Sequence, residues 1–434
     1  MGGGGASSGL AIAVLSIGLL AAGTEGASAS GNRTTHKRQE ASGKAEPIAD
    51  ARCIDQGRSY IWVEALGTCF NPGGYIWAEA YANGYTDYPS DADQTYGIGT
   101  LGLTLNATTS VGFGGPLKTA TDIRFQLRTA DPYGGGPPEL QVEPQTLTAS
   151  WGGVTLGYGT SMFDFYGNAN VEGTDPATIG DSTSLPFIAF TAPFPGGFSA
   201  TLSLEQGSYR GGGIAPSDGD SSAVFGQNAA MPDLVAALGQ TTGWGRYQVS
   251  GALHKVEING SPDFGGSNPA IWGFALQGGV KIDLPMIADK DSLYLQTAYV
   301  DGATTYLGLV DPSGDFTPPD AYYSPAEGFS RVTGWNVTAQ YLHNWTPTLN
   351  SAVFGGYADF DINDALAEAT YGASGAGNVN VGTNLVWSPT NNATLLAQYI
   401  YNYYGAKDYA DTKNGLPAAS QDAHDLLLMA QYAF

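Results

Sequence analysis

Apolar and polar residues alternate with a period of two over most of the chain. In the run from Leu101 to Thr108, one face holds leucines and an alanine, and the other holds glycine, threonine and asparagine. The run from Asp122 to Arg128 alternates in the same way. Successive side chains of a β-strand point to opposite faces, so the pattern predicts strands with one apolar and one polar face. It recurs at Tyr247–Val256, Trp272–Leu284, Leu293–Tyr299, Trp335–Leu342, Ser351–Tyr357, Val381–Val386 and Thr394–Tyr401.

Two kinds of connection join the predicted strands. Long connections are acidic and rich in Gly or Pro, as in Asp131–Pro144, Gly211–Asp220 and Asp311–Ser324. Short connections have the composition of tight turns, as in Phe113–Leu117, Thr346–Leu349 and Pro389–Asn392. Strands of about ten residues, joined by short and long connections in alternation, are typical of a transmembrane β-barrel. A soluble β-sandwich also alternates, but a barrel removes the exposed edges of so large a sheet.

The last predicted strand ends on an aromatic residue. One of its faces holds Leu426, Leu428, Ala430, Tyr432 and Phe434. Chain ends are usually frayed and polar, whereas a strand that closes a membrane barrel places an aromatic side chain at the membrane interface. This ending alone does not distinguish such a strand from a soluble edge strand.

Composition narrows the class of protein. The chain has 434 residues, with 62 Gly, 25 Tyr and only 13% charged residues. Its formal net charge is -23, so it offers no basic stripe for nucleic acid. The many aromatic residues argue against a disordered chain. An all-β protein, with strands punctuated by Gly and Pro, is expected.

The N-terminus has features of an export signal. Leu10–Ala22 is apolar but too short to span a bilayer as a helix, and small residues follow at Ala27–Ala29. The segment before Leu10 carries no Lys or Arg, which is unusual for a signal. We predict a signal peptide at 1–29, a polar periplasmic tail at 30–52 and a barrel at 53–434.

The two cysteines, Cys53 and Cys69, lie close together in the sequence. In an oxidising periplasm such a pair predicts one local disulfide. A metal site is the weaker interpretation, because no histidine cluster lies nearby to complete it. A reactive thiol is a further, minor alternative.

No motif indicates catalysis. Gly97–Gly102 matches G-x-G-x-x-G, but it opens a period-two strand and offers no helix N-terminus to a pyrophosphate. The four histidines are scattered, and no G-x-S-x-G follows the predicted signal peptide. A spatial triad stays open from sequence alone, but we expect no enzyme, no cofactor and no metal.

Several separated segments together resemble one family. These segments are Ala51–Cys53 with Gly67–Tyr75, Trp151–Gly157 with Ser161–Asp164, Met231–Val235 with Ser250–His254, Gly279–Pro285, Tyr341–Pro347 and Trp387–Pro389. Their order and spacing are similar to those of alphaproteobacterial, rhizobial-type trimeric outer-membrane porins. The resemblance implies an antiparallel barrel of about 16 strands, with short periplasmic turns and long external loops, that forms a homotrimer in the outer membrane of a Gram-negative bacterium.

The resemblance also implies a pore constriction, in which the third external loop, roughly Phe163–Leu185, folds into the lumen. Charged side chains across a constriction are the usual means of ion discrimination. Solvation by water is the alternative for any one loop carboxylate, whereas two arginines on one strand face need a lumen or acidic groups to screen them. The candidate residues are Asp164, Glu172, Asp175 and Asp181 on the loop, and Arg124 and Arg128 on the facing wall.

The expected function is passive diffusion of small hydrophilic solutes and ions. Because Asp and Glu number 40 against 17 Lys and Arg, we predict a mild preference for cations. The alternatives are a solute-selective porin and a surface adhesin or receptor barrel. Expected partners are lipopolysaccharide and the barrel assembly machinery, which would read Tyr432 and Phe434 as an assembly signal.

Overall fold

The computed structural model describes residues 52–53, 56, 59–86, 94–129, 139–167, 169–174, 178–219, 231–258, 268–308, 318–407 and 420–434. The predicted signal at 1–29 and the predicted tail, apart from residue 52, lie outside the described residues.

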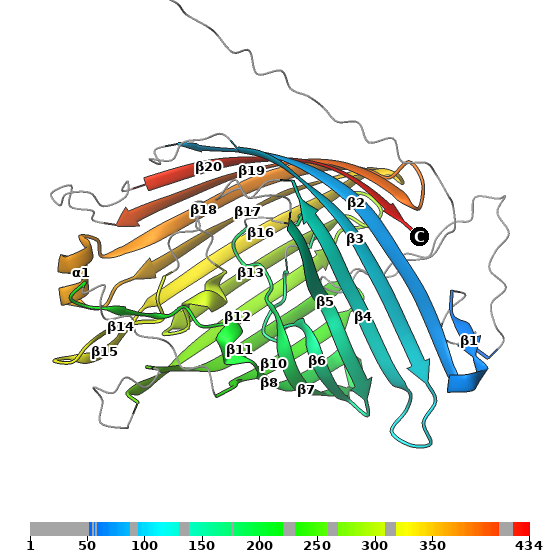
Figure 1. The fold of residues 1–434 in the computed structure, drawn as a ribbon, viewed down its shortest axis with the longest axis horizontal. Coiled ribbons are helices and arrows are strands. Elements are labelled where there is room, and N and C mark those ends of the chain that lie inside the picture. Colours follow the sequence, from blue (N-terminus) through cyan, green and yellow to red (C-terminus); the bar gives the residue numbers. More distant parts are fainter. Residues whose placement is uncertain are drawn as a thin grey trace, which may run out of the picture.

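Sixteen antiparallel strands form one closed barrel (Figure 1). The ring closes where β20 pairs with β2, so neither strand is left with a free edge. The predicted membrane barrel is confirmed. Its strands are β2 (Thr68–Thr86), β3 (Gln94–Thr109), β4 (Leu117–Arg128), β5 (Glu139–Trp151), β6 (Val154–Thr160), β7 (Ser184–Phe194), β8 (Phe198–Glu205), β10 (Asp233–Thr242), β11 (Gly245–Glu257), β12 (Ala270–Asp283), β13 (Ser292–Asp301), β16 (Thr333–Thr346), β17 (Leu349–Asp361), β18 (Gly375–Trp387), β19 (Ala393–Lys407) and β20 (Ser420–Ala433).

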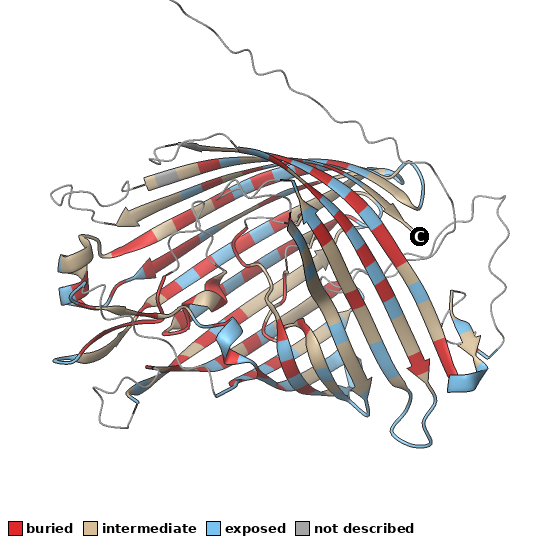
Figure 2. Ribbon diagram, viewed as in Figure 1, coloured by how far each residue is buried: buried red, intermediate tan, exposed pale blue. Residues whose placement is uncertain are grey.

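The period-two pattern sets which side chains face outward. Leu101 and Leu103 of β3 are exposed on the outer surface, whereas Thr104 and Thr108 of the same strand are buried on the inner face. Figure 2 shows the same alternation of buried and exposed residues along neighbouring strands. The apolar face therefore meets lipid and the polar face meets the lumen.

Two girdles of exposed aromatic residues border the outer face. One girdle lies near the short turns, at Trp151, Phe194, Phe198, Trp244, Trp345 and Trp387; the other lies near the long loops, at Trp272, Tyr299, Trp335, Tyr357, Tyr399 and Tyr403. Amphipathic rings favour the membrane-water interface, so the girdles mark its two surfaces. We call the two rims of the barrel the turn end and the loop end.

Three of the long connections differ in detail from the prediction. β5 begins at Glu139, so the connection expected at Asp131–Pro144 is shorter than predicted. The Gly- and Pro-rich runs at 211–220 and 311–324 include short strands, β9 (Ile214–Pro216) and β14 (Ala321–Ser324). Composition did not reveal these strands because each is short and the two that pair with each other are about 100 residues apart.

At the loop end, a second small sheet joins two external connections. β9 pairs with β14, which also pairs with β15 (Gly328–Arg331). Helix α1 (Ala365–Tyr371) packs beside it, because Tyr371 donates a hydrogen bond to Pro216 O at 2.9 Å. Sequence analysis missed α1, which begins where the Asp364 side chain accepts hydrogen bonds from two of its backbone N–H groups. No helix among the described residues is long and apolar enough to cross a membrane. The remaining helices are 3₁₀ turns, η2 (Glu64–Leu66), η3 (Pro195–Gly197), η4 (Gly207–Tyr209) and η6 (Thr304–Leu307).

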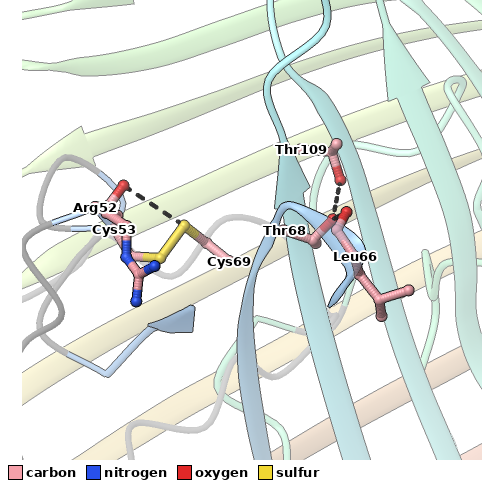
Figure 3. Close-up of a disulfide and its surroundings, with 6 residues drawn as sticks. All are labelled: Arg52, Cys53, Leu66, Thr68, Cys69 and Thr109. Carbon is pink, nitrogen blue, oxygen red and sulfur yellow. Dashed lines mark hydrogen bonds between the residues drawn. A yellow bond between two sulfur atoms is a disulfide. The ribbon is translucent and has the colours of Figure 1, made fainter. Parts of the chain in front are cut away.

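At the turn end, β1 (Ile61–Val63) adds to β2 and a disulfide joins Cys53 to Cys69, as predicted (Figure 3). The disulfide ties the segment before β1 to the first barrel strand. In the chain-entropy model a loop of this size adds about 3 kcal/mol of stability.

The last residue completes the ring at the turn end. Phe434 N donates to Gly74 O at 2.8 Å, and Gly74 N donates back to Phe434 O at 3.0 Å. The Phe434 ring covers Gly74, where an added Cβ would lie 2.7 Å from a ring carbon. The terminal aromatic residue is therefore part of the closing contact.

We expect Phe434→Ala to lower the yield of folded barrel severalfold and to leave the conductance of inserted channels unchanged, because the ring packs outside the lumen. The measurement is the heat-modifiable fraction on a denaturing gel, followed by single-channel recording. Phe194→Ala removes another exposed aromatic residue at the turn end and is the matched control. Equal yields of the two variants would contradict the expectation.

Candidate functional site

Residues 161–183, which we call the constriction loop, connect β6 to β7 and contact the inner wall of the barrel. The structure describes them except for 168 and 175–177. Their contacts follow the wall from β11 through β13, β16, β18 and β19 to β2. The loop therefore lies along a large arc of the lumen, as the family resemblance implied.

Carboxamide side chains on the wall hold the loop. Gln296 Oε1 accepts from Tyr166 N at 2.8 Å. Gln398 binds the backbone of Glu172 twice, accepting from its N–H at 3.0 Å and donating to its carbonyl at 2.7 Å. A carboxamide offers both a donor and an acceptor, so it can satisfy a peptide group that has left water. The full set is Gln248, Gln296, Gln340, Asn380, Asn384 and Gln398.

The start of the constriction loop packs against a glycine of the barrel wall. The Phe165 ring lies against Gly279 of β12, where an added Cβ would come within 2.2 Å of a ring carbon. Arg246 of β11 also lies over that ring, with its guanidinium carbon 4.8 Å from the ring centroid. Beside it, Ser250 donates to Phe163 O at 2.6 Å. Packing and a cation–π contact thus fix the loop where it enters the lumen.

A buried ion pair also holds the constriction loop in place. Arg210, in the connection between β8 and β10, donates to both carboxylate oxygens of Asp164 at 2.6 and 2.7 Å. Its guanidinium also lies 4.5 Å from the centre of the Tyr306 ring. Removing one partner of a buried pair leaves an uncompensated charge, which typically costs about 3–5 kcal/mol. The pair therefore binds the constriction loop firmly to two external connections.

The same network continues to the barrel wall. Tyr306 donates to Asp233 at 2.7 Å, and Asp233 also contacts His254 Nδ1 at 2.8 Å. The other ring nitrogen of His254 lies 3.4 Å from Asp320, which accepts from Thr304 N. These side chains are buried, so they hold the connections in place and do not contact passing solutes.

The far part of the loop rests on β2. Thr174 donates through its N–H and its hydroxyl to the two oxygens of the Glu79 carboxylate, at 2.8 and 2.5 Å. Tyr81 OH accepts from the same N–H at 2.9 Å. Glu79 was not identified from the sequence, although its place on the polar face of an aromatic-rich strand is a usable signal.

Arg124 of β4 lies on a different part of the lumen wall. Its Nε donates to Tyr75 OH at 2.9 Å, and that hydroxyl donates to Asp122 at 3.0 Å. The guanidinium carbon is 4.6 Å from the centroid of the Trp77 ring. Tyr75 reaches Arg124 by crossing Gly102, where an added Cβ would be 2.0 Å from the Tyr75 ring. This explains the last glycine of the G-x-G-x-x-G match as a packing requirement.

The structure separates the predicted constriction residues into three groups. Arg124 and Arg128 share the inner face of β4. On the loop, the Asp164 carboxylate is buried in its ion pair, whereas Asp181 and Glu172 are both partly exposed. Asp175 lies outside the described residues. Sequence reasoning missed Arg246 and Arg210, because neither stands in a recognisable motif.

Desolvation by the surrounding protein raises the pKa of two loop carboxyls, Asp164 and Asp181. It raises the pKa of Asp181 to about 7, although the hydrogen bond from Ser182 N acts against this shift. It also raises the pKa of Asp164, against the lowering effect of Arg210. Asp181 therefore keeps its proton to a higher pH than an ordinary aspartic acid.

We expect the folded barrel to lose stability as the pH rises from about 4 to about 7. The ordinary pKa of Asp181 is 3.8, so in this window the folded protein binds a proton that the unfolded chain has lost. Asp181→Asn should remove this part of the dependence, measured as the unfolding free energy in detergent across a pH series. Asp289→Asn, at an exposed turn, is the control. An unchanged slope in Asp181→Asn would contradict the expectation.

A closed 16-stranded barrel with a polar inner face and a loop held inside it is the architecture of an outer-membrane diffusion channel. A family model described as "Porin subfamily" matches residues 56–430, and the chain belongs to this porin family. It is therefore an outer-membrane porin of a Gram-negative bacterium, and its family and fold indicate a channel and not an enzyme.

Individual relatives agree with this assignment. Porin Omp2b of Brucella suis is 26% identical over 276 residues, which are 61% of this chain and 68% of that protein. Porin Omp2b of Brucella neotomae is 25% identical over 270 residues, with the same coverage. Among solved structures, the outer membrane channel DcaP of Acinetobacter baumannii superposes with a TM-score of 0.62 at 16% identity, covering 86% of this chain and 99% of that one. At these identities the structural likeness shows the fold alone.

Proposed function

We propose that the chain forms a water-filled channel for passive diffusion of small hydrophilic solutes and ions, with a mild preference for cations. One observation carries this proposal: neutral carboxamide side chains of the wall bind the constriction loop along one part of the lumen. A barrel of this size encloses an aqueous lumen, and an inward loop narrows it. The wall at Arg124 then lines the remaining passage.

The charge of the chain supports the cation preference. The formal net charge is -23, and several described bases are already paired with carboxylates, which leaves an excess of negative charge. Arg124 forms no ion pair with a described residue and acts in the opposite direction, so the preference is mild. The paired bases include Arg210, Lys255, Lys281, Arg331 and Lys407.

We expect large ohmic conductance steps in planar bilayers and a reversal potential in a KCl gradient that favours K⁺. Arg124→Gln should raise the K⁺/Cl⁻ permeability ratio about twofold, because one charge some 10 Å away contributes about 0.4 kcal/mol in water. Lys290→Gln removes the same charge from an exposed turn and should change the ratio less. Anion preference in the wild type would refute the proposed selectivity. Absence of conductance would favour the adhesin or receptor alternative.

We further propose a homotrimer, with export directed by residues 1–29 and the turn end in the periplasm. Exposed alanines on β2, Ala78 and Ala80, give a flat outer face on which another barrel can pack closely. At the loop end, ion pairs such as Arg331–Asp301 suit contact with lipopolysaccharide head groups. Tyr432 and Phe434 are proposed to be read by the assembly machinery.

Native mass analysis in detergent should give the mass of three copies. Ala80→Trp should shift the preparation towards monomer, because a bulky ring separates the packed faces. Ala397→Trp places the same ring on the outer face of β19 and should leave the oligomer intact. A monomeric wild type would remove the trimer from the proposal and leave the channel proposal standing.

A further inference from the structure

Three residues form a row across the inner faces of the neighbouring strands β2, β3 and β4, each paired with the next. Trp77 pairs with Thr100, and Thr100 pairs with Gln126. We call these three residues the lumen row. Each is buried, with exposed fractions of 8%, 2% and 0% respectively.

The polar atoms of the lumen row have no hydrogen-bond partner among the described residues. These atoms are Trp77 Nε1, Thr100 Oγ1 and both amide atoms of Gln126. Buried polar groups are normally paired, because leaving them unpaired forfeits the hydrogen bonds that water would provide. A run of three such neighbours on the wall of a transport lumen therefore indicates groups that a ligand or its water completes.

Arg124 stands beside the row, two register pairs closer to the turn end. Only its Nε is used, by Tyr75, and its two terminal amino groups contact no described polar partner. Its stack on Trp77 and its bond to Tyr75 hold the guanidinium in one place. A planar fork of this kind matches a carboxylate better than it matches a neutral group.

We propose that Arg124 and the lumen row form a solute subsite for small hydroxylated carboxylates. The guanidinium takes the carboxylate, and the row offers donors and acceptors to the hydroxyl groups, directly or through water. Because the guanidinium already covers the Trp77 ring, stacking of a neutral sugar on that ring is disfavoured. A single arginine suits a singly charged solute.

The subsite does not conflict with a mild cation preference. A solute held in the lumen leaves it more slowly, so binding reduces the current carried past it. The proposal rests on the proposed channel function, because the subsite acts only if solutes enter the lumen. Its signature is a saturable effect of one solute class on the KCl current.

The test compares three solutes of similar size, gluconate, glucose and glucosamine, added to the full chain in planar bilayers in KCl. Gluconate should reduce the current saturably, with a half-saturation concentration about 10-fold below those of the other two. Arg124→Gln should abolish the difference between gluconate and glucose. Thr100→Val and Gln126→Leu should each raise the gluconate half-saturation about 5-fold, the effect of one lost hydrogen bond.

The matched control is Gln277→Leu, which removes a buried lumen-facing carboxamide with an unpartnered Oε1 from β12 on another part of the wall. It should leave the gluconate response unchanged. A wild type that responds equally to the three solutes would overturn the subsite. So would equal responses of Gln126→Leu, Thr100→Val and the wild type, because charge alone would then explain the effect. A wild type without KCl conductance would refute the channel itself, which is a separate result.

Thr100→Val keeps the shape of the side chain, so it preserves the test if Gln126→Leu fails to fold. Heat-modified migration on a denaturing gel identifies the folded variants. Trp77→Phe adds a second readout, because gluconate should change the tryptophan fluorescence of the wild type more than that of this variant. Identical fluorescence changes in the two proteins would place the carboxylate away from the row.

Discussion

A backbone segment that crosses the inside of a barrel must find partners for peptide groups that no sheet satisfies. This constraint explains most of the interior. The wall supplies carboxamides at the height of the constriction loop, so that residues such as Tyr166 and Glu172 bond to side chains as they would bond to a neighbouring strand. Because these partners are neutral, salt screens them little, and the shape of the constriction depends weakly on ionic strength.

Charge serves a different purpose in this molecule. Behind the loop, the pair of Asp164 and Arg210 is buried and belongs to a network that runs through Tyr306 and Asp233 to His254. In the lumen, Arg124 has no such pairing and is held by aromatic rings. The structure thus separates ionic groups that fix the loop from a cationic group that faces solutes.

The barrel could be predicted from the sequence, whereas the contacts that hold the constriction loop against the wall could not. Strand faces follow from a local period of two, which is why β3, β4 and the closing role of Phe434 could be predicted. The carboxamide partners of the loop are 84 to 226 residues away, as for Gln248 and Gln398, and nothing marks those residues among other lumen amides. Asp164 and Asp181 were predicted as constriction residues; the Asp164 carboxylate is buried in its ion pair with Arg210, whereas Asp181 is partly exposed.

The pairing of β2 with β20 also sets the order of events in assembly. The first barrel strand begins at Thr68, and β1 pairs only with its first three residues; beyond them, that edge is covered by the final strand and by Phe434. Every shorter folding intermediate therefore exposes two unpaired strand edges to the bilayer, where unsatisfied peptide groups are costly. Closure of the ring therefore requires the C-terminal strand, because without it the facing edges of β2 and β19 have no partner in the barrel.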